Sequence, residues 1–170
     1  DDKEFLLKML KINRSIVQDI DLGLLSDKDF SVKAMETVKC GKELYSRLPL
    51  ALKQDRDIVL TIAKRRFLIG MTAAIPDNLA VEYLESGGEY YNIRLQFFDN
   101  RQVALVAVKQ NGLWLQHFTS MLKSDKEVVM AAIQSNCLSI QYASNELKKD
   151  REIMKFVLLE NGACAEYLQE

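Results

Sequence analysis

A three-residue motif, aspartate followed by a basic and then an acidic residue, returns along the chain at nearly even intervals. Successive motifs begin 25, 28, 45, 25 and 25 residues apart when a weaker copy is included. The copies are Asp2–Glu4, Asp27–Asp29, Asp55–Asp57, the weaker Asn100–Gln102, Asp125–Glu127 and Asp150–Glu152. A fixed period of this length indicates one small supersecondary unit repeated along the chain.

Alignment of the copies on their aspartate shows what each unit contains. Apolar residues stand three, seven and eight places after the aspartate, which is the spacing of an apolar stripe on a helix. Asparagine stands eleven places after it at Asn13, Asn111, Asn136 and Asn161. We therefore predict that the aspartate caps a first helix and that a second helix runs back. Asparagine should end the first helix, either in left-handed geometry or by bonding backbone groups of the next hairpin. The second helix is expected to end near residues 122–124 and 147–149.

A helical hairpin of about this size cannot bury its own apolar face, but stacked neighbours can bury it together. The sequence thus predicts an all-α fold, a short solenoid of about five to six stacked helical hairpins with an irregular centre. Residues 1–75 would form divergent repeats, residues 76–99 an irregular repeat or insertion, and residues 100–170 regular repeats, all within one continuous domain.

The centre departs from the pattern. Pro76 breaks the helical register, residues 86–88 form a loop signal, and an aromatic stretch follows with Tyr90, Tyr91, Phe97 and Phe98. Two interpretations remain open for residues 76–99. The segment is either a degenerate hairpin whose aromatic rings belong to the core, or an irregular element that shapes a binding groove.

Composition and motifs exclude several classes of function. The net charge of -1 argues against a nucleic-acid binder. The three cysteines are far apart and form no CxxC pair, so we expect neither a disulfide framework nor a zinc site. No apolar run is long enough to span a membrane. No motif for a nucleotide, a metal or a nucleophile is present, so we assign no catalytic or metal-binding residue and expect no cofactor.

The residues that break the repeat pattern are the best candidates for partner binding, because function in stacked repeats lies in the variable positions. Each has a structural alternative: aromatic side chains pack between repeats, and a basic run offsets the dipole at a helix end. The candidates are Trp114, His117, Tyr90, Tyr91, Lys64, Arg65 and Arg66.

Residues 100–170 resemble a known family through two stretches. These are Ala107–Leu113, which reads AVKQNGL, and Gln141–Glu152, which reads QYASNELKKDRE. They are similar to tandem repeats catalogued only as a domain of unknown function, found in bacteria, including effectors of intracellular pathogens, and in protists and algae. The resemblance implies helical repeats with a scaffold or recognition role, and it implies no catalytic residue. The sequence departs from the pattern at Cys137, which replaces the turn glycine, and at residues 117–119.

The most favoured function is protein–protein recognition or scaffolding by one module of a larger protein, in keeping with the effectors in that family. The chain begins without methionine, so we expect it to be a piece of a longer protein. The alternatives are an enzyme or substrate-positioning lobe with a site near residues 76–99, and a purely structural array. We expect a cytoplasmic location, in a bacterium or a host cell. Apolar residues of the last repeat predict that a further domain or chain contacts the C-terminal end.

Overall fold

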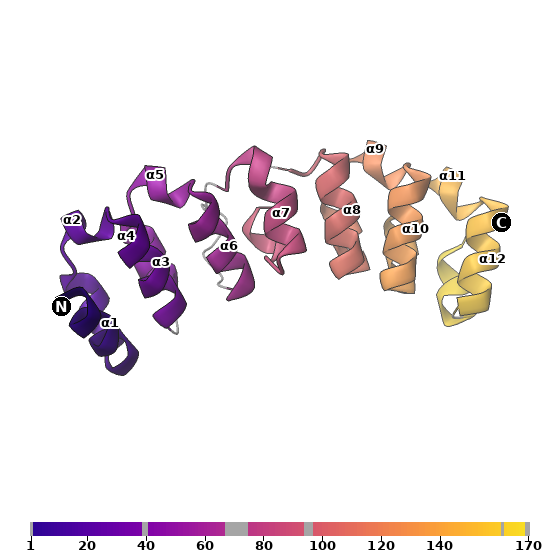
Figure 1. Cartoon of the computed structure of the whole chain (residues 1–170). Coiled ribbons are helices and arrows are strands. Elements are labelled where there is room, and N and C mark those ends of the chain that lie inside the picture. Colours follow the sequence, from indigo (N-terminus) through magenta and orange to yellow (C-terminus); the bar gives the residue numbers. More distant parts are fainter. Residues whose placement is uncertain (1, 39–40, 67–74, 94–96, 161, 169–170) are drawn as a thin grey trace. The chain divides into compact units, whose positions relative to one another are not determined.

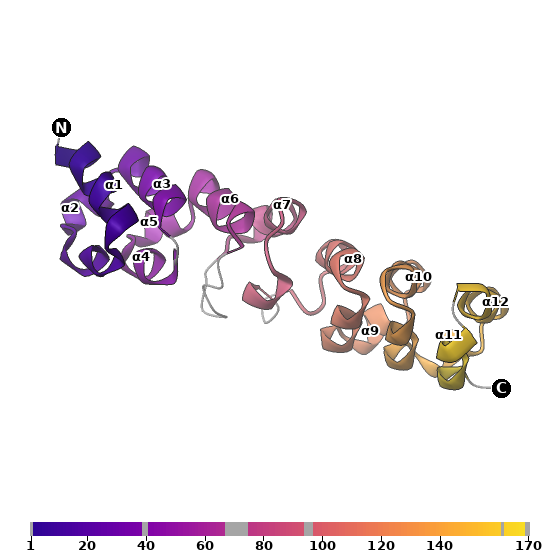
Figure 2. The same cartoon turned by 90° about the horizontal axis from the view of Figure 1, so that it is seen from below.

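The computed structural model describes residues 2–38, 41–66, 75–93, 97–160 and 162–168, and every element in these ranges is a helix. The all-α prediction is confirmed, while the number of hairpins and the single solenoid stay predictions. No helix in the described ranges is long and apolar enough to cross a membrane. Contacts divide the chain into two compact units, Asp1–Ile93 (unit 1) and Arg94–Glu170 (unit 2). Figure 1 shows the helices in the order of the chain, and Figure 2 shows them after a turn of 90°.

Unit 2 consists of two regular repeats and the larger part of a third. In Figure 1 its ten-residue α-helices lie side by side in chain order, and Figure 2 shows the 3-10 helices (η) as a second row beside them. The α-helices are α8 (Arg101–Gln110), α10 (Lys126–Ser135) and α12 (Arg151–Glu160). The returning arms are η4 (Gly112–His117) with α9 (Ser120–Lys123), η5 (Cys137–Tyr142) with α11 (Asn145–Lys148), and η6 (Gly162–Tyr167).

Unit 1 has the same elements in a less regular form. Its helices α1, α3, α6 and α7 contact one another in chain order. The bounds are α1 (Asp2–Ile12), η1 (Arg14–Asp19), α2 (Leu22–Leu25), α3 (Lys28–Thr37), α4 (Gly41–Arg47), α5 (Leu50–Lys53), α6 (Arg56–Lys64), η2 (Asp77–Leu79), α7 (Ala80–Glu85) and η3 (Tyr90–Asn92).

The returning arm differs from the expected second α-helix. A ten-residue α-helix is about 15 Å long, and a six-residue 3-10 helix already covers about 12 Å because it rises about 2 Å per residue. The tighter 3-10 helix therefore returns along the first helix in few residues, and a four-residue α-helix completes the arm. As predicted, α9 and α11 end at Lys123 and Lys148.

The asparagine column lies at the end of the first helix, as predicted, but without the left-handed geometry that is one of its two expected forms. Asn111 and Asn136 are extended, with φ of -155° and -156°, and not left-handed. Each side chain accepts the backbone N–H two residues on, at 3.0 Å from Leu113 and Leu138. Asparagine thus ends the α-helix by capping the 3-10 helix that follows. Asn161 lies outside the described residues.

The predicted caps are confirmed at four aspartates, whereas Asp2 lies within the first turn of α1. Asp27 accepts the N–H of Phe30 at 2.8 Å, and Asp55 accepts the N–H of Asp57 at 2.9 Å. Asp125 accepts two N–H groups, from Glu127 at 3.0 Å and Val128 at 3.1 Å. Asp150 does the same, with Glu152 at 2.9 Å and Ile153 at 3.1 Å. These bonds satisfy N–H groups that have no partner inside the helix.

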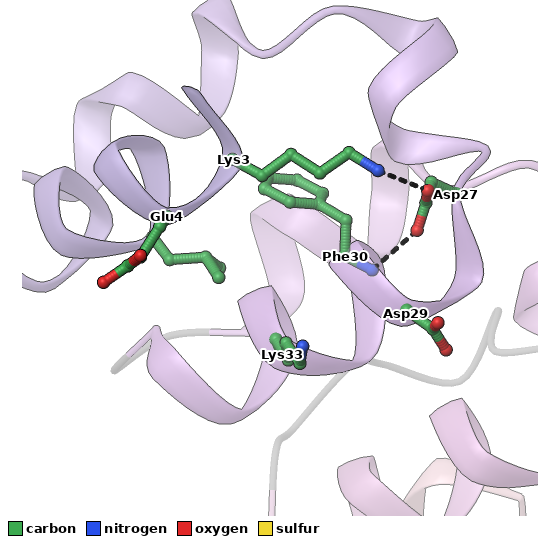
Figure 3. A pocket seen from close by; sticks show the side chains of 7 residues that line it. Lys3, Glu4, Asp27, Asp29, Phe30 and Lys33 are labelled. Atoms are coloured by element: carbon green, nitrogen blue, oxygen red, sulfur yellow. Dashed lines mark hydrogen bonds and ion pairs between the residues drawn. The ribbon is translucent and has the colours of Figure 1, made fainter. Parts of the chain in front are cut away.

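In four of the motifs the basic residue binds one or both acidic residues of the next motif, an arrangement that we call the motif ion pairs. Figure 3 shows one of them, between α1 and α3, with the cap bond of the same aspartate. In chain order they are Lys3 with Asp27 at 2.6 Å, Lys28 with Asp55 at 2.9 Å and Asp57 at 2.7 Å, Arg101 with Asp125 at 2.7 Å and with Glu127, and Lys126 with Asp150 at 2.9 Å and Glu152 at 2.8 Å. Arg56 binds Glu82 of α7, which lacks the motif. The motif therefore holds neighbouring helices in register as well as starting each one.

Residues 75–93 pack against α6 as the last layer of unit 1. Tyr83 and Tyr90 are fully buried, and the Asn92 side-chain amide donates to the Tyr83 hydroxyl at 2.7 Å. Gly87, with φ of +97°, closes the C-terminus of α7, where its N–H donates to the Leu84 carbonyl. Of the aromatic stretch, Tyr90 and Phe97 belong to the core, while Tyr91 and Phe98 are exposed.

Cys137 and Cys164 form a disulfide between η5 and η6, with their Cα atoms 6.1 Å apart. The expectation of no disulfide framework therefore missed this bond. They stand 27 residues apart, one repeat plus two positions, which places them opposite each other on adjacent arms. Comparison of equivalent positions alone could not find such a pair. Cys40 lies outside the described residues.

Close packing at Gly112 generates a first prediction. A Cβ atom there would lie 2.1 Å from the backbone carbonyl oxygen of Ala132, so the two repeats could not keep their spacing. We expect Gly112→Ala to lower the free energy of unfolding by about 1–3 kcal/mol, as overpacking does. Urea denaturation followed by circular dichroism measures this. Gly23→Ala is the control, because its Cβ would meet only the side chain of Asp21, at 3.2 Å; equal losses in both variants would contradict the packing argument.

The two roles of Asp125 generate a second prediction. Asp125→Ala removes cap and ion pair together, and we expect a loss of about 0.5–2 kcal/mol in the free energy of unfolding. Asp125→Asn keeps a capping oxygen and loses only the ion pair, so we expect a loss of about 0.2–1 kcal/mol. Urea melts that show no loss for the alanine variant would remove the capping account.

Candidate functional site

A groove of about 470 Å³ runs along one edge of unit 2, where the chain enters α8 and where α9 begins. Two hydrogen bonds position the groove. The Asn100 side chain accepts the N–H of Val103 at 3.0 Å, which starts α8. The Thr119 N–H donates to the Phe98 carbonyl at 3.0 Å. The groove is lined by Phe98, Asp99, Arg101, Thr119, Met121, Leu122 and Asp125.

The apolar side chains of the groove are unusually exposed. Phe98 is 48% exposed and Met121 is 84% exposed, while Leu122 at the base is buried. Two large apolar groups in water beside a concave surface are typical of a binding site. Methionine suits such a site because its flexible, polarisable side chain adapts to different partners.

The next repeat contains the same backbone arrangement with polar side chains. There the Ser144 N–H donates to the Lys123 carbonyl at 2.9 Å, as Thr119 does to Phe98. Lys123 therefore occupies the place of Phe98, and Glu146 occupies the place of Met121. The fold evidently accepts a lysine and a glutamate at these two positions, so the apolar pair is not required for folding.

The polar residues of the next repeat also make local hydrogen bonds that Phe98 and Met121 do not make. Lys123 donates to the Gln116 carbonyl at 2.9 Å, which ties its own returning arm. Glu146 lies at the start of α11, where hydrogen bonds from its own backbone N–H and from Ser144 hold the pKa of its carboxyl below the usual value. Met121 makes no such contribution to α9, and the Thr119 side chain accepts no capping hydrogen bond. Local helix stability therefore does not explain Met121.

Arg101 and Asp125, two of the three charged residues that line the groove, are paired with each other. Arg101 binds Asp125 at 2.7 Å and also binds Glu127. The hydrogen bond from Arg101 holds the pKa of Asp125 below its ordinary value of 3.8, and the same bond raises the pKa of Arg101. The groove thus offers an apolar surface whose one lining cation, Arg101, is already neutralised by acidic partners.

A second hollow, of about 510 Å³, lies between α1 and α3 and has a different character. Figure 3 shows Lys3 and Lys33 among the acidic Glu4, Asp27 and Asp29 around it. Its central contact is the motif ion pair of Lys3 and Asp27, so we assign it to the stacking of the helices. In the described part of the chain, no group of three His, Cys, Asp or Glu side chains is placed to hold a metal ion.

The predicted site residues lie in two places. Trp114 and His117 are half-buried on η4 of unit 2, with ring centroids 5.4 Å apart and a 42° angle between the rings. Tyr90 is fully buried in unit 1, so its ring belongs to the core and offers no surface. Tyr91 is exposed beside it on η3. The structure therefore brings Trp114 and His117 together and buries Tyr90 in the core.

The basic run 64–66 ends α6 and has mainly structural contacts. Arg65 donates to the carbonyl of Val38, the residue that ends α3, at 2.7 Å. Arg66, with φ of +52°, pairs with Glu89 at 3.1 Å. Lys64 is exposed. This agrees with the interpretation of the run as a helix end.

Sequence reasoning missed the groove because it treated Phe98 as one member of an aromatic stretch. The available signal was a comparison between repeats: Phe98 stands where Lys123 and Lys148 stand in later repeats, and Met121 stands where Glu146 stands. A change from charged to apolar at an exposed position of a repeat identifies a specialised surface.

Acid titration of the charge pairs beside the groove generates a third prediction. Because the pKa of Asp125 is lowered in the folded state, its stabilising effect is complete above the unfolded value of 3.8 and is lost as pH falls through the folded pKa. The pKa values of Asp27 and Asp150 are lowered in the same direction by Lys3 and Lys126. We expect the free energy of unfolding to be steady from pH 7 to about 5 and to fall below about 4.

The single tryptophan, Trp114, lies in unit 2, so its fluorescence reports the unfolding of that unit in urea at each pH. Arg101→Gln is the matched variant, because it removes the cation that lowers the pKa of Asp125, and its stability should depend less on acid. Identical pH dependence in both proteins would show that the Arg101–Asp125 pair is not energetically coupled to folding.

Comparison with known sequences supports the resemblance of unit 2 alone. The family described as "Domain of unknown function (DUF4116)" matches residues 100–148 and again residues 125–170. These two ranges begin at Asn100 and Asp125, the first residues of two motif copies. No curated protein and no solved structure matches the chain.

Proposed function

We propose that this chain is a protein-recognition module and that the groove of unit 2 receives an apolar side chain of a partner protein. The observation that carries the proposal is the pair Phe98 and Met121, exposed above a groove at positions where the next repeat has Lys123 and Glu146. Binding removes such apolar surface from water, which is the main favourable term in protein association.

The chemistry of the groove favours a protein over other partners. Arg101, the cation that lines it, is engaged by Asp125 and Glu127, so no free positive charge of the groove addresses a phosphate group. The exposed apolar pair, the buried Leu122 and the Thr119 hydroxyl fit an apolar peptide side chain with a polar neighbour.

The alternative of an enzyme near residues 76–99 has weaker support. Catalysis needs titratable groups that converge on one cavity with shifted pKa values. In the described part of that segment, Tyr83, Tyr90 and Asn92 are buried in the core, and Phe98 opens onto an apolar groove. Recognition is therefore the function that the geometry favours.

The wider setting belongs to the same proposal. A groove of this kind acts as one contact of a scaffold within a larger protein, as the resemblance to effector repeats implies. The disulfide between Cys137 and Cys164 argues against the expected cytoplasmic location, because stable disulfides are rare in reducing compartments.

A double variant tests the proposal with little risk to the fold. Phe98→Lys combined with Met121→Glu places in this groove the side chains that the next repeat already holds at the same backbone positions. We expect an unchanged or slightly higher free energy of unfolding. Peptides selected on the wild-type chain from a random display library should bind the double variant about tenfold or more weakly, as loss of a central contact implies. Fluorescence anisotropy with labelled peptides measures this.

The control is Leu50→Lys, which changes an exposed leucine of α5 in unit 1 in the same chemical direction. It should leave peptide affinity unchanged. If the selected peptides bind the double variant as tightly as the wild type, or if the library yields no specific peptide, the groove is not the recognition site.

A further inference from the structure

Asp99 is the charged residue of the groove that the chain leaves unpaired. The other two charged residues that line it, Arg101 and Asp125, bind each other at 2.7 Å, and Arg101 also binds Glu127. Within the described ranges, no residue donates a hydrogen bond to the Asp99 side chain or forms an ion pair with it, and the side chain is exposed. Its carboxylate is therefore open to a partner.

The start of α8 is capped without the Asp99 carboxylate. Asn100 is the capping residue, and its uncharged side chain accepts the N–H of Val103 at 3.0 Å. A carboxylate beside the first turn still interacts favourably with the helix dipole. This interaction uses neither oxygen as a hydrogen-bond acceptor, so both oxygens of Asp99 can accept from another molecule.

Within unit 2, the carboxylate is specific to the repeat that has the exposed apolar pair. The residue directly before the motif is Ser124 in the next repeat and Lys149 in the one after it. In unit 1 the same position is held by Asp1, which lies outside the described residues, and by Ser26 and Gln54. Phe98, Asp99 and Met121 thus occur together, and all three line one groove.

The charges at the groove are unbalanced toward negative. One guanidinium, that of Arg101, stands against three carboxylates, those of Asp99, Asp125 and Glu127. Lys126, the residue after Asp125, does not compensate, because the acidic residues of α12 bind it. A positively charged group of a partner is therefore attracted to the groove, and a negatively charged one is repelled.

The ring of Phe98 attracts the same kind of group. The face of an aromatic ring carries negative partial charge, so a cation lies favourably against it. Phe98 is 48% exposed and directly precedes Asp99, and both residues line the groove. A lysine or arginine side chain can cover the ring with its apolar stem and bring its charge to the carboxylate.

We propose that the partner segment bound by the groove carries a basic side chain beside the apolar one, and that Asp99 binds this basic side chain. The inference rests on the proposed function and names the chemistry of its partner. Phe98 and Met121 hold the apolar residue of a peptide, while Asp99 selects a lysine or arginine next to it. Asp99 is thus the residue that determines specificity in an otherwise apolar contact.

Peptides selected on the wild-type chain from a random display library are the probe. We expect them to share a lysine or arginine beside an apolar residue. Asp99→Asn should weaken their binding about tenfold or more, and so should glutamine in place of the basic residue of the peptide. The two changes together should cost little more than either alone, because they remove the same contact. Raised salt should weaken binding to the wild type more than to Asp99→Asn.

Reversal of the charge separates recognition from a structural role. A fresh selection on Asp99→Lys should yield peptides with an acidic residue in place of the basic one. A purely structural role at the start of α8 predicts only a lower free energy of unfolding, measured by urea denaturation with circular dichroism. Asp77→Asn is the matched control and should leave peptide affinity unchanged, because Asp77 is an exposed aspartate at the start of η2 and does not line the groove.

The two proposals fail in different ways. Peptides that lose affinity for the Phe98→Lys, Met121→Glu double variant but bind Asp99→Asn as tightly as the wild type overturn this inference and leave recognition by the groove standing. Selected peptides that share no basic residue do the same. Peptides that bind the double variant as tightly as the wild type overturn both.

Discussion

One carboxylate serves two partners at the start of α3, α10 and α12. In Asp27, Asp125 and Asp150, the Oδ1 atom accepts backbone N–H groups of its own helix, and the Oδ2 atom binds the cation of the helix before it. Serine or asparagine would cap as well, but neither offers a second oxygen with negative charge. The start of each helix and its register against the previous helix are thereby tied to the same atom group.

Because the same carboxylate caps its own helix and binds the previous one, small helical units can stack in register. Each exposed ion pair contributes little by itself, and each cap contributes about 1 kcal/mol. The caps and ion pairs mainly fix where the helices lie, because they align the apolar faces of neighbouring helices at one end. At the other end, Gly112 lets η4 approach the Ala132 carbonyl of the next helix, while Cys137 at the equivalent position of η5 forms a covalent link to Cys164. Burial between these two ends supplies the main stabilisation.

A framework held in this way leaves other surface positions free to vary. The positions of Phe98 and Met121 carry a lysine and a glutamate in the next repeat, with the backbone bond between the two segments unchanged. A binding surface can therefore change by substitution at such positions without cost to the stack.

Local chemistry made much of this structure predictable. The recurring aspartate and the helical spacing of apolar residues determined the all-α class, the start of each motif helix and the place of the asparagines, because caps and stripes depend on residues close in sequence. Only tertiary structure decided four other features: the 3-10 form of the returning arm, the disulfide, the burial of Tyr90 and the groove at Phe98. Each depends on which residues of adjacent repeats lie opposite one another, and the spacing between repeats, set by packing, determines that.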